Sequence, residues 1–497
     1  MKATIRLDID HQLGEIDRRI FGGFMEHLGR CVYKGIYEPG SMLSDADGFR
    51  KDVLETLRRL QMPCMRYPGG NFVSSYDWRD GIGPRDARPS RLDQAWKSTD
   101  PNTFGIDEFI RWCRKAGTEP LVAVNQGTLG PREASDLIEY CNVSGGTYWS
   151  DLRRSNGSEE PHDVKLWCLG NEMDGPWQAG HGPAMDYAKR AQQTAHLMRR
   201  IDPSIELVLA GSSGRQMGTY LDWDREVLEY CWEDVDYISA HQYSRNFEED
   251  SAWFLAEGVE IERILEDYTG LLKYIRGVKK SNKQVYVAFD EWNVWYKNVE
   301  RDGNWDFAPH LLEEVYNLED ALICAQYLSA FIRHSQVVKI ACLAQVVNAI
   351  APIQTRQDGL LLQTTYHTFR LYSENARGMA LSPVVEGPTY DAGARGEVPV
   401  LDVAASFDID SSMVSLFIVN RSLDDDMEIE VSSADANINR VVGVEVLTGD
   451  DPKVHNTWDH PDLVAPIAGS AAMEDGRVRL RVPSIGLAVV RMLLGRQ

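Results

Sequence analysis

The sequence predicts an α/β protein in which a (β/α)8 TIM barrel is followed by a C-terminal all-β sandwich of the jelly-roll type. Eight apolar runs alternate with helical segments over residues 19–378, and continuously apolar strands separated by helices are typical of a parallel sheet. From about Leu381 short strands follow one another without helical periodicity. A doubly wound open sheet is the alternative, but no Gly-x-Gly-x-x-Gly turn follows the first strand, which disfavours a dinucleotide fold.

The barrel strands recur along the chain with a helix between most of them. We expect strands over residues 20–26, 62–66, 120–125, 164–172, 206–210, 235–241, 285–291 and 338–345. We expect helices over 47–60, 106–116, 132–140, 185–201, 223–232, about 260–278 and 318–335. A Gly-, Pro- and Arg-rich excursion, residues 72–101, follows the second strand. Eight strand–helix units are the number that closes a TIM barrel.

Residues outside the barrel form the second unit. We expect residues 1–18 to hold a strand that pairs with the sandwich, 19–378 to form the catalytic barrel, and 379–497 to form the sandwich. Its clearest strands cover residues 414–420, 427–432, 441–447, 478–482 and 487–493. Such a domain either binds carbohydrate or has a structural or oligomerising role.

Composition excludes several classes of partner. The chain has 497 residues, and 75 acidic against 52 basic side chains give a net charge of −23. Nucleic acid and anionic membrane surfaces are poor partners for so acidic a protein. The N-terminus lacks the apolar core of a signal peptide, and no run is long enough to span a bilayer. Eight scattered cysteines without a Cys-x-x-Cys pair indicate free thiols, so we expect a cytoplasmic protein.

Two strands each end in a glutamate. Val164–Glu172 is an apolar run that ends in Gly-Asn-Glu, and Val285–Glu291 repeats the pattern about 120 residues later. In a barrel, the carboxyl ends of the strands surround one site. Two carboxyl groups held there, one acting as acid and base and the other as nucleophile, are what a retaining glycosidase requires.

Polar residues end most of the other predicted strands. They are Glu26, Asn71, Asn125, Gln126, His241, Tyr243, Gln345 and Asn348. Each alone is typical of a turn, but together they predict one polar pocket if the barrel closes. No His-Glu-x-x-His, P-loop or Gly-x-Ser-x-Gly motif is present. We therefore expect neither a metal nor a cofactor.

Several longer motifs resemble a known family, the α-L-arabinofuranosidases of glycoside hydrolase family 51. The motifs are Phe24-Met-Glu-His-Leu-Gly-Arg30, Arg66-Tyr-Pro-Gly-Gly-Asn71, Trp167-Cys-Leu-Gly-Asn-Glu-Met-Asp-Gly-Pro-Trp-Gln178, Asp290-Glu-Trp-Asn-Val-Trp-Tyr296 and Gln345-Val-Val-Asn-Ala-Ile-Ala-Pro-Ile353. The resemblance covers essentially the whole chain. It implies a retaining (β/α)8 glycosidase with carboxylates on strands four and seven, and a hexameric assembly.

The resemblance also implies roles for single residues. Glu172 would be the general acid/base and Glu291 the nucleophile. Tyr243 would donate to Glu291, and Asn171 would bind the sugar 2-hydroxyl. The remaining expected site residues are the hydroxyl-binding Glu26, Asn71 and Gln345, the tryptophan walls Trp96, Trp177 and Trp295, and the supporting His241.

Asp290 is a second carboxylate beside the expected nucleophile. Asp290 directly precedes Glu291, and consecutive strand residues point to opposite faces. Asp290 is therefore expected to be structural, with an exchange of the two roles as the alternative. His241 is expected to support Tyr243 or the nucleophile.

Three functions remain open from the sequence. The first is an exo-acting α-L-arabinofuranosidase that releases arabinose from arabinan or arabinoxylan oligosaccharides. The second is another retaining glycosidase on the same barrel, such as a β-xylosidase or an endoglucanase. The third is a non-catalytic sugar-binding protein, which the presence of both glutamates disfavours. The excursion over residues 72–101 favours exo action because it can close one end of the pocket.

Overall fold

The computed structural model describes residues 1–495 and contains a closed barrel of eight parallel strands. The strands follow one another around the barrel in chain order. They are β3 (Gly22–Phe24), β4 (Cys64–Tyr67), β7 (Glu119–Ala123), β8 (Leu166–Leu169), β9 (Glu206–Leu209), β10 (Tyr237–Ser244), β11 (Tyr286–Val294) and β12 (Val338–Ala344). The predicted (β/α)8 class is confirmed, and the open doubly wound alternative is excluded by the closure.

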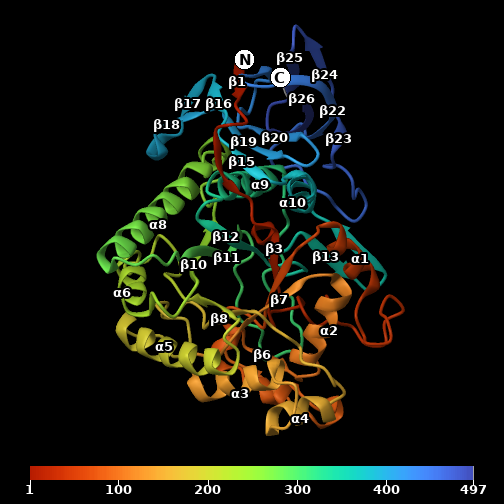
Figure 1. Ribbon diagram of the computed structural model, residues 1–497. Helices are drawn as coiled ribbons and strands as arrows, with labels where there is room; N and C mark the ends of the chain where they lie inside the picture. The colour runs from red at the N-terminus through yellow and green to blue at the C-terminus, as the bar shows by residue number, and fades with distance from the viewer. Residues whose placement is uncertain (496–497) are drawn as a thin grey trace.

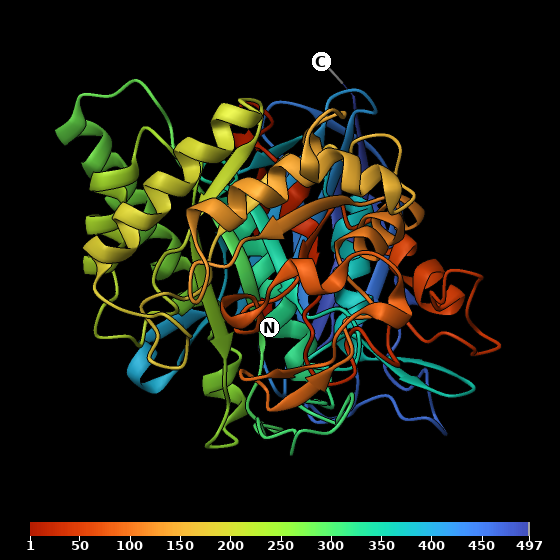
Figure 2. The same cartoon turned by 90° about the horizontal axis from the view of Figure 1, so that it is seen from below.

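Helices surround the barrel, as Figures 1 and 2 show from two directions. They are α1 (Lys51–Arg59), α2 (Ile106–Ala116), α3 (Pro131–Asn142), α4 (Tyr148–Ser155), α5 (Ala184–Ile201), α6 (Asp222–Cys231), α7 (Ser251–Phe254), α8 (Gly258–Lys279), α9 (Leu318–Arg333) and α10 (Thr364–Asn375). The interior of the barrel is filled by small and branched side chains such as Ala123, Val208 and Ile340. The barrel is therefore a packed core, and a site can form only at its rim.

Short elements occupy the connections. The excursion after β4 holds the 3-10 helices η2 (Phe72–Ser75), η3 (Trp78–Gly81) and η4 (Arg85–Ala87), and the hairpin β5 (Arg91–Asp93) and β6 (Ser98–Asp100). A second hairpin, β13 (Ile353–Arg356) and β14 (Gly359–Leu362), follows β12. The turn η1 (Arg18–Phe21) leads into β3.

The sandwich has two sheets with a shared apolar core. One sheet has the order β16 (Val384–Glu386), β1 (Lys2–Leu7), β21 (Met427–Ser433), β25 (Arg477–Val482) and β24 (Ala471–Glu474). The other has the order β2 (Gln12–Glu15), β15 (Met379–Leu381), β19 (Leu401–Asp408), β20 (Met413–Asn420), β26 (Gly486–Gly495), β22 (Asn437–Leu447) and β23 (Ile467–Ala468). The N-terminal β1 pairs in parallel with β21.

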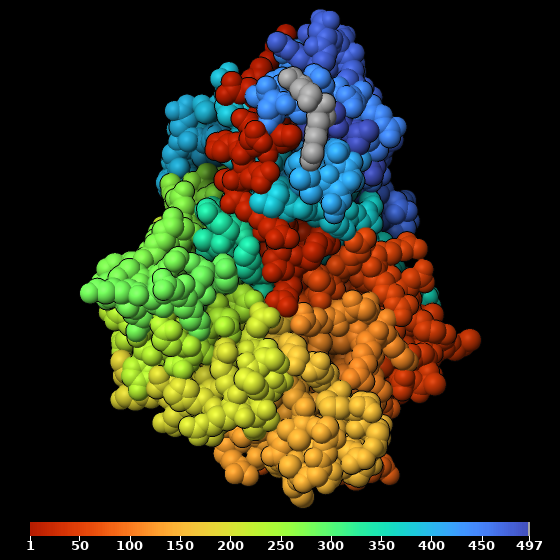
Figure 3. Space-filling view, viewed as in Figure 1, coloured from red at the N-terminus to blue at the C-terminus, as the bar shows by residue number. Residues whose placement is uncertain are grey.

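The seven-stranded sheet packs directly on two barrel helices. Tyr372 of α10 stacks on Phe417 of β20 with ring centroids 4.3 Å apart, and Arg333 of α9 forms an ion pair with Asp402 of β19 at 3.0 Å. In the space-filling view of Figure 3, the N-terminal residues run from the sandwich at the top down onto the barrel. All eight cysteines are free and buried. None of the helices within residues 1–495 has the length and apolar character needed to cross a bilayer.

Candidate active site

A pocket of about 320 Å³ opens at the carboxyl ends of the barrel strands. Glu172 follows β8 after the turn Gly170–Asn171, and its own backbone has a φ of +44°. Glu291 lies within β11. Of the eleven residues to which the family resemblance gives a role, all except Asn171 and His241 line this pocket: Glu26, Asn71, Trp96, Glu172, Trp177, Tyr243, Glu291, Trp295 and Gln345. The strand ends therefore bring together side chains that are up to 319 residues apart in the sequence.

The two glutamates face each other across the pocket. One carboxyl oxygen of Glu172, one of Glu291 and one ring nitrogen of His241 all lie within 4.8 Å of one another. Retaining glycosidases hold their two carboxyl groups about 5–5.5 Å apart, whereas inverting enzymes need a wider gap for water. The observed spacing fits a retaining enzyme.

Glu172 has two hydrogen-bond donors and little contact with solvent. Trp177 donates its Nε1 proton to Oε2 at 2.6 Å, and His241 Nδ1 lies 2.9 Å from Oε1. Burial raises the pKa of Glu172, the contact with His241 lowers it, and the negative charge of Glu291 raises it again; the balance is upward. A carboxyl group with a raised pKa can keep a proton at neutral pH and donate it.

His241 links Glu172 to a deeper carboxylate. Its Nε2 lies 3.0 Å from Ser239 Oγ and 3.3 Å from Asp290 Oδ1, and its Nδ1 is 3.7 Å from Glu291. Burial opposes the cationic form, but Glu291, Asp290 and Glu172 outweigh it and raise the pKa of His241 to about 10. The expected support of Tyr243 or the nucleophile is thus only part of the picture, because the shortest contact with a glutamate is to Glu172.

The expectation that Asp290 points away from Glu291 is wrong. Arg66 Nε pairs with Asp290 at 3.0 Å, and its Nη1 pairs with Glu291 at 2.6 Å. The pairing of β11 with β12 shifts register between Phe289 and Trp292, and that of β10 with β11 shifts at the same level. Such irregularities break the strict alternation of strand side chains, so both carboxylates reach one guanidinium. Asp290 is fully buried below the pocket.

Arg66 is the main site residue that the sequence analysis missed. It binds Asp290 and Glu291 and also donates from Nη2 to Asn171 Oδ1 at 2.6 Å. This orientation leaves the buried Asn171 Nδ2 without a partner in residues 1–495, and therefore free to donate to a ligand. The signal in the sequence is an arginine inside the apolar strand β4, since a buried arginine requires carboxylate partners.

Glu291 has a third polar partner. Tyr243 donates its hydroxyl proton to Glu291 Oε2 at 2.9 Å, opposite the contact of Arg66 with Oε1. Both donors stabilise the negative charge of the carboxylate. Burial, followed by the negative charges of Glu291 and Glu172, raises the pKa of Tyr243 well above its usual value, so this phenol stays a donor.

Glu26 lines the same pocket and is held by three hydrogen-bond donors. Its Oε1 accepts from Phe72 N and Trp96 Nε1, each at 3.0 Å, and its Oε2 accepts from Gln345 Nε2 at 3.0 Å. Burial, followed by the charge of Glu291, raises the pKa of Glu26 to about 8. Asn71 also lines the pocket. These groups offer both donors and acceptors to a polyol.

Aromatic and basic side chains form the walls. Trp96 and Trp295 are nearly buried, while Trp177 is 41% exposed and lies at the mouth. Arg301 stacks over Trp295 with its guanidinium 4.5 Å from the ring centroid. The sequence analysis did not predict these further lining residues, which come from loops: Leu28, Ser213, Gln216, Met217, Arg245, Arg301, Leu312 and Ile350.

Besides His241, three of the eight polar strand ends do not line the pocket. Asn125 binds Tyr76 O and Thr128 Oγ1, Gln126 binds Thr194 Oγ1, and Asn348 binds Arg30 O and Thr355. The expected convergence of all eight residues is therefore too broad. These three amides fix the loops that surround the site.

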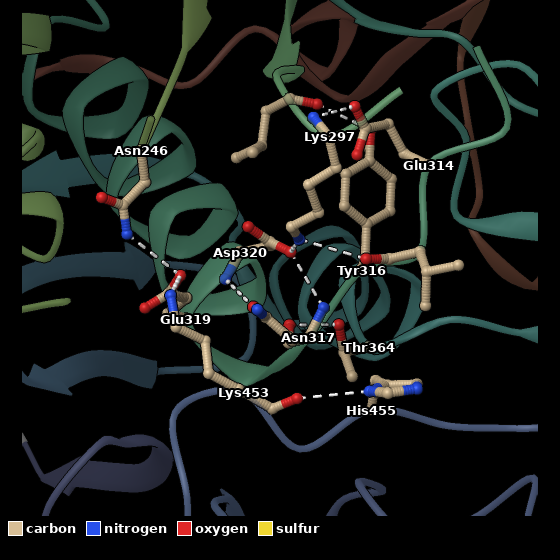
Figure 4. Close-up of polar contacts among 12 residues, drawn as sticks. Asn246, Lys297, Glu314, Tyr316, Asn317, Glu319, Asp320, Thr364, Lys453 and His455 are labelled. Atoms are coloured by element: carbon tan, nitrogen blue, oxygen red, sulfur yellow. Dashed lines mark hydrogen bonds and ion pairs between the residues drawn. The ribbon is translucent and has the colours of Figure 1, made fainter. Parts of the chain in front are cut away.

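A second cluster of charged side chains, in which the carboxylates are buried, holds the loop that follows β11 (Figure 4). We call it the α9 cluster; it consists of Lys297, Glu314, Glu319, Asp320 and Lys453. Glu314 Oε1 accepts from the backbone N–H groups of residues 296, 297 and 298 at 2.8–3.0 Å. Lys297 pairs with Asp320, and Lys453 of the sandwich pairs with Glu319. The cluster thus anchors the segment that carries Trp295.

Metal binding has one geometric candidate. Within the part of the chain that the structure describes, Glu172, His241 and Glu291 are the group of acidic, His and Cys side chains close enough to share an ion. Both nitrogens of His241 already contact protein oxygens, and the raised pKa keeps its ring protonated. A protonated imidazole has no free lone pair for a metal, so the donor set does not suit one.

Two domain families match the chain. The family described as "Alpha-L-arabinofuranosidase 1 domain" matches residues 56–257, and the family described as "Alpha-L-arabinofuranosidase C-terminal domain" matches residues 290–485. The first segment contains Glu172 and the second contains Glu291.

Individual relatives are similar over nearly the full length. An intracellular exo-α-(1→5)-L-arabinofuranosidase from Acetivibrio thermocellus is 44% identical over 96% of both chains. An exo-α-(1→6)-L-arabinofuranosidase from Bifidobacterium longum is 42% identical over 99% of this chain and 97% of that protein. Among solved structures, AbfB, a family 51 α-L-arabinofuranosidase from Bifidobacterium longum, has a TM-score of 0.95 and 38% identity over 99% of both chains. The likeness includes both the barrel and the sandwich.

Proposed function

The chain belongs to the α-L-arabinofuranosidases of glycoside hydrolase family 51, and we propose that its exo-acting hydrolysis proceeds by double displacement at Glu172 and Glu291. The enzyme removes terminal non-reducing α-L-arabinofuranosyl residues from oligosaccharides. The observation that carries the residue assignment is the asymmetry of the two carboxyl groups, which lie within 4.8 Å of each other. Arg66 and Tyr243 donate to Glu291, whereas Glu172 has a raised pKa.

In the first step Glu291 attacks C1 of the arabinofuranosyl residue while Glu172 protonates the departing oxygen. The C1–O bond breaks and an ester between C1 and Glu291 forms. Arg66 and Tyr243 hold the attacking carboxylate in place. We assign the contact with the 2-hydroxyl, which strengthens as positive charge develops on the ring, to Asn171 Nδ2, because this donor is buried and has no partner within residues 1–495.

In the second step Glu172 acts as a base. Esterification removes the negative charge of Glu291, which is one of the causes that raise the pKa of Glu172. The contact with cationic His241 remains and favours the carboxylate. Glu172 then accepts a proton from water, water attacks C1, and Glu291 leaves with two inversions completed.

The shape and polarity of the pocket suit a furanose. About 320 Å³ accommodates one small sugar, and Glu26, Asn71 and Gln345 offer hydrogen bonds to its hydroxyl groups. The exocyclic CH2OH and the C–H faces can pack on Trp96 and Trp295. A sugar that leaves these buried polar groups unpaired would be rejected strongly.

The test is NMR of the product during hydrolysis of an aryl α-L-arabinofuranoside, with an aryl β-D-xyloside measured in parallel. We expect the α-anomer of arabinose to form first and little action on the xyloside. First formation of the β-anomer would contradict double displacement. Preference for the xyloside would favour a β-xylosidase and overturn the assignment of the pocket.

We further propose a cytoplasmic location and a hexameric assembly. The location is supported by the word intracellular in the name of the Acetivibrio thermocellus relative, and the assembly by the family resemblance. Light scattering after gel filtration tests the assembly. The related names include both (1→5) and (1→6) linkages, so we expect linkage preference to depend on groups outside the sugar pocket.

A further inference from the structure

A second cavity, of about 710 Å³, adjoins the active-site pocket. The two share Gln216, Tyr243 and Arg245 in their walls. The second cavity extends from these residues between the loop after β9 and the first turns of α7 and α8. We call it the side groove. Its volume lies within the range of small-molecule binding sites.

The side groove begins on the side of the pocket where the leaving group must depart. Glu172 follows β8, while Gln216 follows β9 and Arg245 follows β10, the next strands around the barrel. Because Glu172 protonates the departing oxygen, the remainder of the substrate has to lie beside Glu172 and outside the sugar pocket. The shared residues lead from that position into the side groove.

The lining of the side groove is polar but balanced in charge. Arg215 pairs with Glu260 and lies 3.8 Å from Asp267, and Arg395 pairs with Glu257. Because these charges neutralise one another, the groove has little net charge to attract an anionic or cationic ligand. Trp253 and Tyr220 add aromatic surface. Aromatic rings beside hydrogen-bonding side chains suit a neutral, hydroxyl-rich ligand.

The sandwich domain contributes to this groove. Its hairpin, β17 (Thr389–Asp391) and β18 (Glu397–Pro399), extends toward α8 in Figures 1 and 2. Between these strands, Arg395 stacks on Trp253 with the guanidinium 3.7 Å from the ring centroid and donates to Trp253 O. Tyr390 Oη donates to Ala252 O at 3.1 Å. The hairpin therefore fixes Trp253 in place before any ligand arrives.

We propose that the side groove binds the sugar units of the leaving chain, so that the enzyme favours linear arabinofuranosyl oligosaccharides longer than a disaccharide. This proposal rests on the proposed function and deepens it. The sandwich then has a role in substrate binding, through the hairpin that holds Trp253. Ordering Trp253 in advance reduces the entropy lost on binding.

The test compares kcat/KM for an aryl α-L-arabinofuranoside and for arabinobiose, arabinotriose and arabinotetraose. With the unsubstituted enzyme we expect kcat/KM to rise about tenfold between arabinobiose and the longer chains, which corresponds to about 1.4 kcal/mol. Equal values for all chain lengths would overturn the proposal. Failure to hydrolyse the aryl arabinofuranoside would instead contradict the proposed function.

Substitution of Trp253 tests whether the leaving chain binds in the side groove. Trp253→Ala should reduce the ratio of kcat/KM for arabinotriose to that for arabinobiose about tenfold, because it removes the aromatic surface. The matched control is Trp458→Ala: Trp458 is also half-buried, has Arg356 at 4.3 Å from its ring centroid, and lines neither cavity. An unchanged ratio in Trp253→Ala, or an equal loss in Trp458→Ala, would overturn the proposal. If Trp253→Ala does not fold, Gln216→Ala replaces it, with the same two outcomes.

Discussion

Two clusters of charged side chains lie near the carboxyl end of β11, and each contains three carboxylates and two cations. The catalytic cluster consists of Arg66, Glu172, His241, Asp290 and Glu291. The α9 cluster consists of Lys297, Glu314, Glu319, Asp320 and Lys453 (Figure 4). Similar composition therefore supports two different roles, one facing a ligand pocket and the other fixing the loop and helix beside it.

The carboxylates of the two clusters differ in their exposure to solvent. Glu172 and Glu291 are 8% and 5% exposed and line the pocket, whereas Glu314, Glu319 and Asp320 are all at 0%. Burial raises the pKa of Glu172, but it also raises the pKa of Glu314 and of Asp320. A raised pKa alone is therefore a poor marker of a catalytic carboxyl group. A raised pKa beside a pocket and a second carboxylate is the more specific signal.

The largest difference between the clusters is expected for removal of the nucleophile. Glu291→Gln should lower kcat on an aryl α-L-arabinofuranoside by about 10⁴-fold or more, because the covalent ester cannot form. Asp320→Asn makes the same chemical change in the α9 cluster and should leave kcat within about threefold of the unsubstituted value. Steady-state kinetics on both folded variants checks this. Comparable losses in the two variants would contradict the assignment of Glu291.

Substitution of the acid/base Glu172 should reduce kcat/KM by a smaller factor, and this factor should depend on the leaving group. Glu172→Gln should reduce kcat/KM on natural oligosaccharides about 10²–10⁴-fold. An activated aryl leaving group needs less protonation and should suffer less. Added azide should restore turnover and yield an arabinofuranosyl azide of retained configuration, which NMR identifies.

The control for this variant is Glu314→Gln, which keeps an oxygen to accept from residues 296–298. We expect no dependence on the leaving group and no rescue by azide in this variant. Undiminished activity of Glu172→Gln on natural oligosaccharides, or azide rescue in both variants, would refute the role of Glu172.

Substituting one cation in each cluster should distinguish an effect on stability from an effect on activity. Arg66→Met leaves Asp290 and Glu291 without their shared partner, so we expect a loss of about 3–5 kcal/mol in the free energy of unfolding and a fall of about 10²-fold in kcat/KM. Lys297→Met leaves Asp320 buried without its partner and should cost about 3 kcal/mol, with kcat/KM little changed. Denaturant unfolding measures the loss of stability in each variant, and steady-state kinetics on the same samples measures the change in kcat/KM. If Lys297→Met lost activity as Arg66→Met does, the two clusters would be one functional unit.

Much of this arrangement could be predicted from the sequence, because it depends on local patterns. Apolar runs that end in Glu172 and Glu291 predict buried strands, and strand ends in a closed barrel converge. The side to which Asp290 points could not be predicted, because it depends on the register between β11 and its neighbours. Arg66 was missed because its three partners come from residues 171, 290 and 291, which only the fold brings together.

The α9 cluster was also not predicted. Glu314, Glu319 and Asp320 lie in a stretch whose acidic residues are typical of an exposed helix N-terminus, but all three are completely buried in the fold. Lys453, which pairs with Glu319, comes from the sandwich. Local sequence cannot reveal a contact between two domains, whereas the glutamates at the strand ends needed only the barrel.

The smallest expected effect concerns two of the four buried histidines, His241 in the catalytic cluster and His367 outside both clusters. Burial lowers the pKa of His367 to about 4, whereas the surrounding carboxylates raise that of His241 to about 10. His241 therefore contributes stability that is complete below its unfolded pKa of about 6.5 and is lost as the pH rises through 10. His367 has the opposite sign, since its neutral burial costs stability as the pH falls from about 6.5 through 4.

Replacing each histidine by asparagine tests the difference. His241→Asn removes the contact that lowers the pKa of Glu172, so the alkaline limb of the plot of kcat/KM against pH should move to higher pH. The value of kcat/KM at neutral pH should fall about tenfold. His367→Asn should leave that limb in place and instead stabilise the protein at pH 5, as measured by thermal unfolding. An alkaline limb that stays fixed in His241→Asn would mean that the imidazolium does not tune Glu172, and that the catalytic cluster controls its acid only through burial and Glu291.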